Sequence, residues 1–208
     1  MRIESVASQP DRIGRYRVCL ETGEVLRLYR QTVEDHGIYS GRELSDEEMA
    51  RLRVAIGEMS AKMRAVRIVS ASSVSRYDLE QRLIQKGEDS RQAKDAVVWM
   101  ESLNLVDDQK TAEQVVHHCI SRGYGISRAK QALYEKRIPK KYWDEALSEY
   151  PDQSDHILAF LKSRLNADAQ ERDIKRAVDA LLRRGHTYGQ IRRCLEQLRL
   201  DLEDFREE

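Results

Sequence analysis

The chain has 208 residues, with 36 lysines and arginines against 36 aspartates and glutamates. This length fits one large domain or two small ones. Charged residues make up 35% of the chain, above the roughly 25% of an ordinary globular protein, but 40% are hydrophobic, which excludes a disordered chain with nothing to bury. Because only three prolines occur among many Leu, Ala, Glu, Lys, Arg and Gln residues, the composition predicts a mainly α fold.

The sequence also carries signals about location. No uncharged apolar run approaches the roughly 18 residues that a membrane-spanning helix needs, and the first residues lack the apolar core of a signal peptide. The three cysteines, Cys19, Cys119 and Cys194, form no Cys-x-x-Cys pair and are odd in number, which is typical of reduced thiols. We therefore expect a cytoplasmic protein that binds no membrane.

Strand-like patterns occur in the N-terminal region, residues 1–44. Residues 1–12 show no pattern and are expected to be frayed, whereas residues 16–20 and 25–29 are short runs rich in β-forming residues. Gly23 lies between these runs, where a hairpin turn needs a positive φ. The sequence predicts a β-hairpin, which is marginally stable alone and must pack against another part of the chain.

A long helix is predicted to begin at Ser45, because Ser45 and Glu48 have the spacing of a capping box. Apolar residues follow at steps of three and four up to Val66, which gives the helix one apolar face. Residues 45–60 are interpreted as the start of a linker helix that packs against its own chain. A short coiled coil with a partner is the alternative.

Three segments in the rest of the chain share one pattern of apolar residues. Gly87, Arg137 and Gly185 serve as the reference residues of the alignment. In each segment, apolar residues occur eight and four residues before the reference residue and six and ten residues after it. Successive reference residues are 50 and 48 residues apart, a spacing typical of tandem structural repeats. The aligned residues are Leu79, Leu83, Ala93 and Val97, then Ala129, Leu133, Trp143 and Leu147, then Ala177, Leu181, Ile191 and Leu195.

Each repeat is predicted to contain three helices, because capping residues divide it into three helical stretches. Gly87 and Gly185 are expected to end the second helix with a positive φ, and Arg137 at the same place should be under mild backbone strain. The predicted fold is an elongated array of three tandem three-helix repeats, preceded by the hairpin and the linker helix. The predicted boundaries are 61–107 for repeat 1, 108–151 for repeat 2, 152–200 for repeat 3 and 201–208 for an acidic tail.

No arrangement of residues predicts catalysis. The segment around Gly123 and Gly125 lacks the preceding strand and third glycine of a dinucleotide-binding fingerprint. His117, His118 and Cys119 are consecutive, so on a helix they point about 100° apart and do not converge on one metal ion. We expect no metal, no cofactor and no enzymatic activity.

Positive charge is concentrated in repeats 2 and 3 although the total charge is zero. Residues 122–141 contain seven basic residues against Glu135 alone, and repeat 3 is rich in arginine before the acidic tail. Such a concentration of Lys and Arg among tyrosines suits phosphates or an acidic protein groove. Solvated helix faces with ion pairs between successive turns are an equally good interpretation.

Four stretches resemble the RecX family of regulators of the RecA recombinase, and the resemblance covers about residues 60–200. The motifs of the family are similar to the stretches 77–87, 103–108, 122–138 and 184–191, which include Lys86-Gly87, Asp107-Asp108 and Arg184-Gly185. Two positions depart from the family pattern. Thr111 stands where the family usually has an aromatic residue, and Arg137 replaces the central glycine.

This resemblance implies a binding protein and no active site. Members of the family bind the RecA filament on single-stranded DNA along its helical groove and modulate, usually by inhibition, strand exchange, ATP hydrolysis and cleavage of the SOS repressor. Weak direct DNA binding is also attributed to them. We expect a cytoplasmic monomer in homologous recombination and DNA repair. The residues assigned to the RecA- and DNA-binding surface are Arg122, Arg128, Lys130, Lys140, Lys141, Arg176, Arg183, Arg184, Arg192 and Arg193.

Three other functions stay open at this point. A helical DNA-binding protein that acts without RecA would bind duplex DNA with steep salt dependence, but the near-neutral total charge disfavours it. A protein scaffold with an unknown partner would neither bind DNA nor regulate RecA. An enzyme would need a site that the sequence does not reveal.

Overall fold

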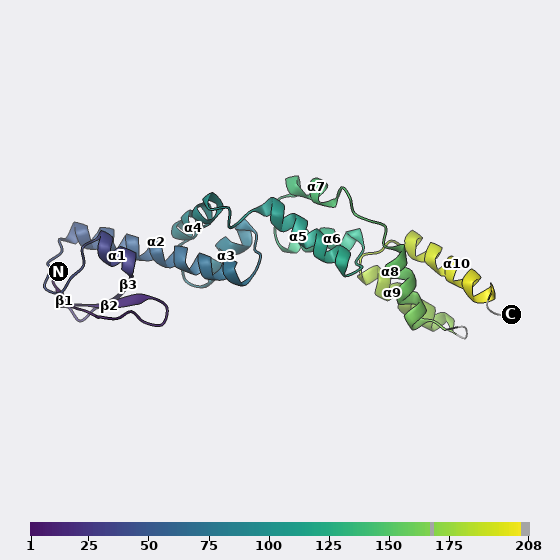
Figure 1. The fold of residues 1–208 in the computed structure, drawn as a ribbon, viewed down its shortest axis with the longest axis horizontal. Helices are drawn as coiled ribbons and strands as arrows, with labels where there is room; N and C mark the ends of the chain where they lie inside the picture. Colours follow the sequence, from purple (N-terminus) through teal and green to yellow (C-terminus); the bar gives the residue numbers. More distant parts are fainter. Residues whose placement is uncertain (167–168, 205–208) are drawn as a thin grey trace. The chain divides into compact units, whose positions relative to one another are not determined.

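Figure 1 shows the computed structural model of the chain, a mainly α-helical protein with a small sheet near its N-terminus. The structure describes residues 1–166 and 169–204, the last six of these by their backbone alone. Its contacts divide the chain into two compact units, Met1–Val106 and Asp107–Glu208. Each unit has hydrophobic cores of its own.

The N-terminal sheet has three antiparallel strands in the order β1-β2-β3. They are β1 (Ile3–Val6), β2 (Arg15–Leu20) and β3 (Val25–Tyr29). β2 and β3 form the predicted hairpin around Gly23, whose φ is +85°. The prediction that residues 1–12 are frayed is wrong, because β1 pairs with β2 and the Ile3 side chain is fully buried in the core.

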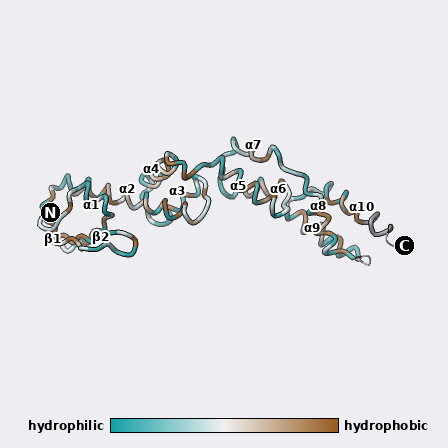
Figure 2. Tube along the Cα trace, in the orientation of Figure 1, coloured by the Kyte–Doolittle hydropathy of each residue, from teal (hydrophilic) through white to brown (hydrophobic). Residues whose placement is uncertain are grey.

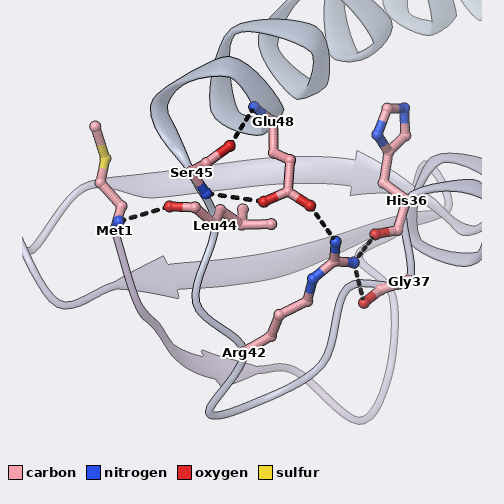
Figure 3. Close-up of polar contacts among 7 residues, drawn as sticks. All are labelled: Met1, His36, Gly37, Arg42, Leu44, Ser45 and Glu48. Carbon is pink, nitrogen blue, oxygen red and sulfur yellow. Dashed lines mark hydrogen bonds and ion pairs between the residues drawn. The ribbon is translucent and has the colours of Figure 1, made fainter.

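Polar contacts join the end of α1 (Arg30–Asp35) to the start of α2 (Asp46–Ala71). The Arg42 guanidinium donates hydrogen bonds to the carbonyl oxygens of the two residues that follow α1 (Figure 3). The same group forms an ion pair of 2.9 Å with Glu48 in the first turn of α2. One arginine therefore satisfies free carbonyl groups at one helix end and holds the first turn of the next helix.

The predicted capping box at the start of α2 is confirmed. The Ser45 hydroxyl accepts from the backbone N–H of Glu48, and the Glu48 carboxylate accepts from the backbone N–H of Ser45 (Figure 3). The hydrogen bond from Ser45, together with the Arg42 guanidinium, lowers the pKa of Glu48. Beside the box, the N-terminal amine of Met1 donates to the carbonyl oxygen of Leu44 at 2.8 Å.

The linker helix and the first helix of repeat 1 are one continuous helix, α2, which runs through the predicted boundary at residue 60. Its first half packs on the sheet, where Met49 and Leu52 are buried. Its second half packs on repeat 1, where Ala61 and Ala65 are fully buried. The apolar face predicted for this helix is therefore used within the chain.

The remaining helices form the three repeats. Repeat 1 combines the end of α2 with α3 (Arg76–Gln85) and α4 (Ser90–Ser102), and repeat 2 has α5 (Asp108–Ser121), α6 (Ile126–Glu135), the 3₁₀ turn η1 (Lys140–Tyr142) and α7 (Trp143–Leu147). Repeat 3 has α8 (Ser154–Arg164), α9 (Glu171–Arg183) and α10 (Tyr188–Asp204). Because α10 continues past residue 200, residues 201–204 of the predicted acidic tail are helical. Residues 205–208 lie outside the described part.

The aligned apolar positions of the repeats are the centres of their cores. All four of these side chains are buried in repeat 1, and the first three are buried in repeat 3. In repeat 2 the first two are buried, whereas Trp143 and Leu147 of the short α7 are only half-buried. The shared pattern of apolar residues therefore marks the packing of each second helix against its neighbours.

The turn that closes each second helix follows the sequence prediction. Gly87 and Gly185 have φ values of +89° and +87°. Arg137 at the equivalent place has a φ of +54°, so a residue with a Cβ occupies the left-handed region there. The predicted backbone strain at Arg137 is therefore confirmed as a positive φ, and the Arg137 guanidinium lies 5.3 Å from the centroid of the Tyr134 ring.

Replacing Arg137 with glycine should relieve this strain. We expect Arg137→Gly to be more stable than Arg137→Ala by about 1 kcal/mol, because alanine keeps the positive-φ penalty and both variants lose the contact with Tyr134. Urea unfolding of the two variants, followed by circular dichroism, measures the difference. Equal stability would show that the turn carries no strain.

Hydrophobic and hydrophilic residues alternate along the helices (Figure 2). This pattern is typical of helices that bury one face and expose the other. Among the described residues, no helix combines the length and the apolar character that crossing a membrane requires.

Candidate partner-binding surface

Repeats 2 and 3 meet within unit 2 at two glycines. The backbone N–H of Gly125 donates to the carbonyl oxygen of Arg184 at 2.9 Å, and that of Ser127 donates to the carbonyl oxygen of Gly185 at 3.3 Å. A Cβ atom at Gly125 would lie 2.0 Å from the Gly185 oxygen, and one at Gly185 would lie 2.3 Å from the backbone nitrogen of Arg128. The close approach of the two backbones therefore needs both glycines, and it brings basic residues of the two repeats together.

His186 is buried at this joint and only 4% exposed. Its Nε2 lies 3.1 Å from the carbonyl oxygen of Gly123, so the neutral ring donates from Nε2. Its Nδ1 is buried and has no hydrogen-bond partner within residues 1–166 and 169–198. Burial lowers the pKa of His186, and the positive charge of Arg184 and the neighbouring His156 lower it further, against the opposing effect of the Gly123 carbonyl.

The lowered pKa predicts that unit 2 loses stability in mild acid. Because the pKa of His186 is lower in the folded state than its ordinary value of 6.5, the unfolded chain takes up this proton first. The stability that the neutral His186 ring contributes to the folded state is therefore fully present above pH 6.5 and is lost as the pH falls below this value. Thermal melts between pH 7.5 and 5 should show a smaller loss for His186→Gln than for the wild type, whereas His117→Gln on the exposed face of α5 should behave as the wild type.

The predicted surface residues of repeat 2 are spread over α5, α6 and η1. Arg128 is half-buried and lies 3.3 Å from Glu135, so its charge is partly neutralised within the helix. The Lys141 ammonium lies 4.6 Å from the centroid of the Tyr142 ring. The other three are exposed at the end of α5, on α6 and in η1: Arg122, Lys130 and Lys140.

Repeat 3 gathers three of the predicted arginines around one cavity. Arg176, Arg183 and Arg184 lie along one side of α9 and line a cavity of ≈ 410 Å³ between α8 and α9. The α8 side is formed by Phe160 and Arg164, which the sequence analysis missed. We call this feature the α8–α9 cleft; its lining residues are Phe160, Arg164, Asp173, Arg176, Ala177, Ala180, Arg183 and Arg184.

Arg192 and Arg193 are exposed on α10. Arg192 forms an ion pair of 2.8 Å with Glu196, which raises its pKa, and lines a second cavity between α9 and α10. The α9 residues of that cavity, among them Val178 and Leu182, lie about half a helical turn away from those of the α8–α9 cleft. The ten predicted residues therefore do not form one face, because α9 separates those of the cleft from those of α10.

The sequence offered a partial signal for the two missed residues. Arg164 follows Phe160 by four residues, so both lie on the same face of a helix, where the guanidinium reaches the ring. What no local pattern shows is that this face turns toward the basic side of α9. That arrangement comes from the packing of α8 on α9 through Ile157, Leu161 and Leu181.

The described residues contain no group of three or more histidine, cysteine, aspartate or glutamate side chains that could hold a metal ion. Cys119 and Cys194 are buried thiols, and burial raises the pKa of both. What the arrangement can do chemically is to bind anions, because guanidinium groups are strong hydrogen-bond donors to phosphates and carboxylates. Unit 2 therefore combines two three-helix repeats with a basic cleft in the second of them.

Comparison with known proteins finds one family that this chain resembles. The family model for RecX, second three-helix domain, matches residues 107–147. "Regulatory protein RecX" of Clostridioides difficile strain 630 is 23% identical over 203 residues, which cover 95% of this chain and 94% of that protein. Its namesake from Vibrio parahaemolyticus is 25% identical over 136 residues, which cover 64% and 88%.

Solved structures show the same fold. A crystal structure of regulatory protein RecX aligns with a TM-score of 0.66 over 94% of this chain and 98% of that one, at 18% identity. A crystal structure of RecX from Lactobacillus salivarius gives a TM-score of 0.61 over 70% and 99%, at 20% identity. In sequence and in fold, the chain is therefore similar to regulatory proteins of the RecX family.

Proposed function

We propose that this chain binds the RecA filament on single-stranded DNA, in its helical groove, and inhibits its ATP hydrolysis, strand exchange and cleavage of the SOS repressor. The similarity to the RecX family supports a regulatory role. The observation that carries the proposal is the basic surface of repeats 2 and 3, above all the four arginines of the α8–α9 cleft. In this proposal the protein acts as a monomer in the cytoplasm.

The charge of this surface suits both components of the proposed partner. A nucleoprotein filament presents DNA phosphates and acidic protein faces, and both attract exposed arginine and lysine side chains. Such contacts are individually weak, because exposed ion pairs contribute only about 0–1 kcal/mol each. Repeated three-helix units add many of them together, since each repeat offers its own set of contacts.

The test is RecA-dependent ATP hydrolysis on single-stranded DNA, measured while the protein is titrated into the reaction. We expect hydrolysis to fall and then level off as the filament is saturated. A flat response at saturating protein would contradict the proposal. Tight, salt-sensitive binding to duplex DNA in a reaction without RecA would instead favour an independent helical DNA-binding protein.

A further inference from the structure

The α9 helix of repeat 3 has a second apolar face beside the one that it buries. Ala177 and Leu181 are buried in the core of the repeat. Three further apolar side chains follow one another at a spacing of four residues, so they form a row along the helix, and they are half-buried or exposed: Ile174, Val178 and Leu182. Repeat 3 therefore covers this row only in part.

The row forms one wall of the second cavity of repeat 3, which has a volume of ≈ 590 Å³. α10 forms the other wall with the half-buried Leu195 and with Tyr188, which is 64% exposed. We call this feature the α9–α10 groove; its lining residues are Glu171, Ile174, Lys175, Val178, Asp179, Leu182, Tyr188, Arg192, Leu195 and Glu196. Because apolar side chains alternate with charges of both signs that nearly cancel, the groove suits a protein surface.

The other repeats show that the fold does not require this apolar row. In the repeat alignment, the place of Val178 is taken by Glu80 in repeat 1 and by Lys130 in repeat 2, and both are charged. All three repeats nevertheless form the same helical unit. An apolar row that is left partly open on one repeat alone is typical of an interaction site.

The charges beside the row indicate which protein surface fits. Lys175 and Asp179 are exposed and lie one turn apart on the same flank of the row. Within the described residues, neither of them forms an ion pair. A lysine that precedes an acidic residue by four positions is the less favourable order for a pair within one helix. Both charges are therefore available to opposite charges on another molecule.

An antiparallel pair of α9 helices makes this surface complementary to itself. When Val178 of one copy lies opposite Val178 of a second copy, Ile174 lies opposite Leu182 of the second copy. Asp179 of the second copy is then level with residue 177, about 3 Å along the axis from Lys175. A twofold axis brings equal flanks together, so the ion pair between Lys175 and Asp179 forms twice.

We infer that the α9–α10 groove is a self-association surface, on which α9 of a second copy of this chain lies antiparallel to α9 with Val178 at the centre. The dimer is expected to be weak, with a Kd of about 10 µM, because two short helices from each copy make a small interface. Arg192 lines the groove, so the dimer covers one residue of the predicted partner-binding surface. This inference goes beyond the proposed function: dilution releases the monomer that acts there, and self-association opposes its binding at high concentration.

The experiment is sedimentation velocity of the full chain, without RecA or DNA, at concentrations below and above the expected Kd. K175D and D179K each turn the two opposite-charge pairs into two like-charge pairs, so each should raise the Kd at least about tenfold. An equimolar mixture of the two variants should form a dimer again, with a Kd within about threefold of the wild-type value. In the mixture, the aspartates of one variant face the lysines of the other.

Two further variants separate apolar packing from total charge. Leu182→Gln removes an apolar side chain that is 42% exposed, so the fold should be kept while the Kd rises about tenfold. Lys94→Asp makes the same charge change as K175D at an exposed place in unit 1 and should dimerise as the wild type does.

Three outcomes would overturn the inference. A wild-type chain that sediments as a monomer well above the expected Kd would leave the groove to a different protein. A dimer that neither K175D nor L182Q weakens would form through another surface. If K175D and D179K stayed monomeric in the mixture, the copies would not meet through antiparallel α9 helices. Because the assay contains no RecA, these outcomes are independent of whether the chain regulates the filament.

Discussion

Replacing Gly125 with alanine should break the joint between repeats 2 and 3. The new Cβ would lie 2.0 Å from the carbonyl oxygen of Gly185, which is backbone and cannot rotate away. The variant must lengthen the hydrogen bond from residue 125 to the Arg184 carbonyl and expose His186. Since overpacking costs about 1–3 kcal/mol and a lost backbone hydrogen bond adds about 1 kcal/mol, we expect a loss of about 3 kcal/mol.

Gly189→Ala is the matched control for this variant. Gly189 lies in the first turn of α10 of the same unit, and a Cβ there would meet nothing within 4 Å. Alanine is favoured over glycine in a helix by about 1 kcal/mol, so this variant should be as stable as the wild type or slightly more stable. Denaturant unfolding measures both. If Gly125→Ala matched the control, the two repeats would not be held together by the contact between their backbones.

Reversing three arginines of the predicted surface should remove most of the regulation. Arg122, Arg183 and Arg193 have no ion-pair partner among the described residues, so changing each to glutamate leaves no carboxylate without its partner. We expect the concentration for half-inhibition of RecA-dependent ATP hydrolysis to rise at least tenfold, because like charges at an interface cost several kcal/mol. The melting temperature should change little, since all three side chains are exposed.

The control for charge reversal lies in unit 1. Arg12, Arg91 and Lys94 are exposed there, and their replacement by glutamate changes the net charge by the same amount. This variant should inhibit hydrolysis as the wild type does. If both triple variants lost activity equally, total charge and not the surface of repeats 2 and 3 would be responsible.

Features with short-range causes could be predicted from the sequence. The capping box at Ser45 and the positive φ of Gly87, Arg137 and Gly185 depend on residues within one or two turns, and the structure confirms them. Strand β1 was missed because it is stabilised by pairing with β2, more than ten residues away. The apolar face of α2 was predicted up to Val66, but the sequence did not show that two separate cores cover the two halves of this helix.

The sequence predicted which basic residues belong to the candidate surface, but it did not predict how these residues are arranged in space. The spacing of Arg176 and Arg183 places both on one helix face, and this could be read from the sequence. The contribution of Phe160 and Arg164 depends on how α8 packs on α9, and the place of Arg192 beside a different cavity depends on how α10 packs on α9. Tertiary packing, which periodicity does not specify, therefore decides which charges act together.

Co-sedimentation with preformed RecA filaments on single-stranded DNA tests the proposed function most directly. The wild-type chain should pellet with the filament in a saturable manner at moderate salt, and the variant with Arg122, Arg183 and Arg193 changed to glutamate should remain largely in the supernatant. If the wild-type chain stays in the supernatant at every concentration, or pellets equally with DNA alone, then it does not act by binding the RecA filament.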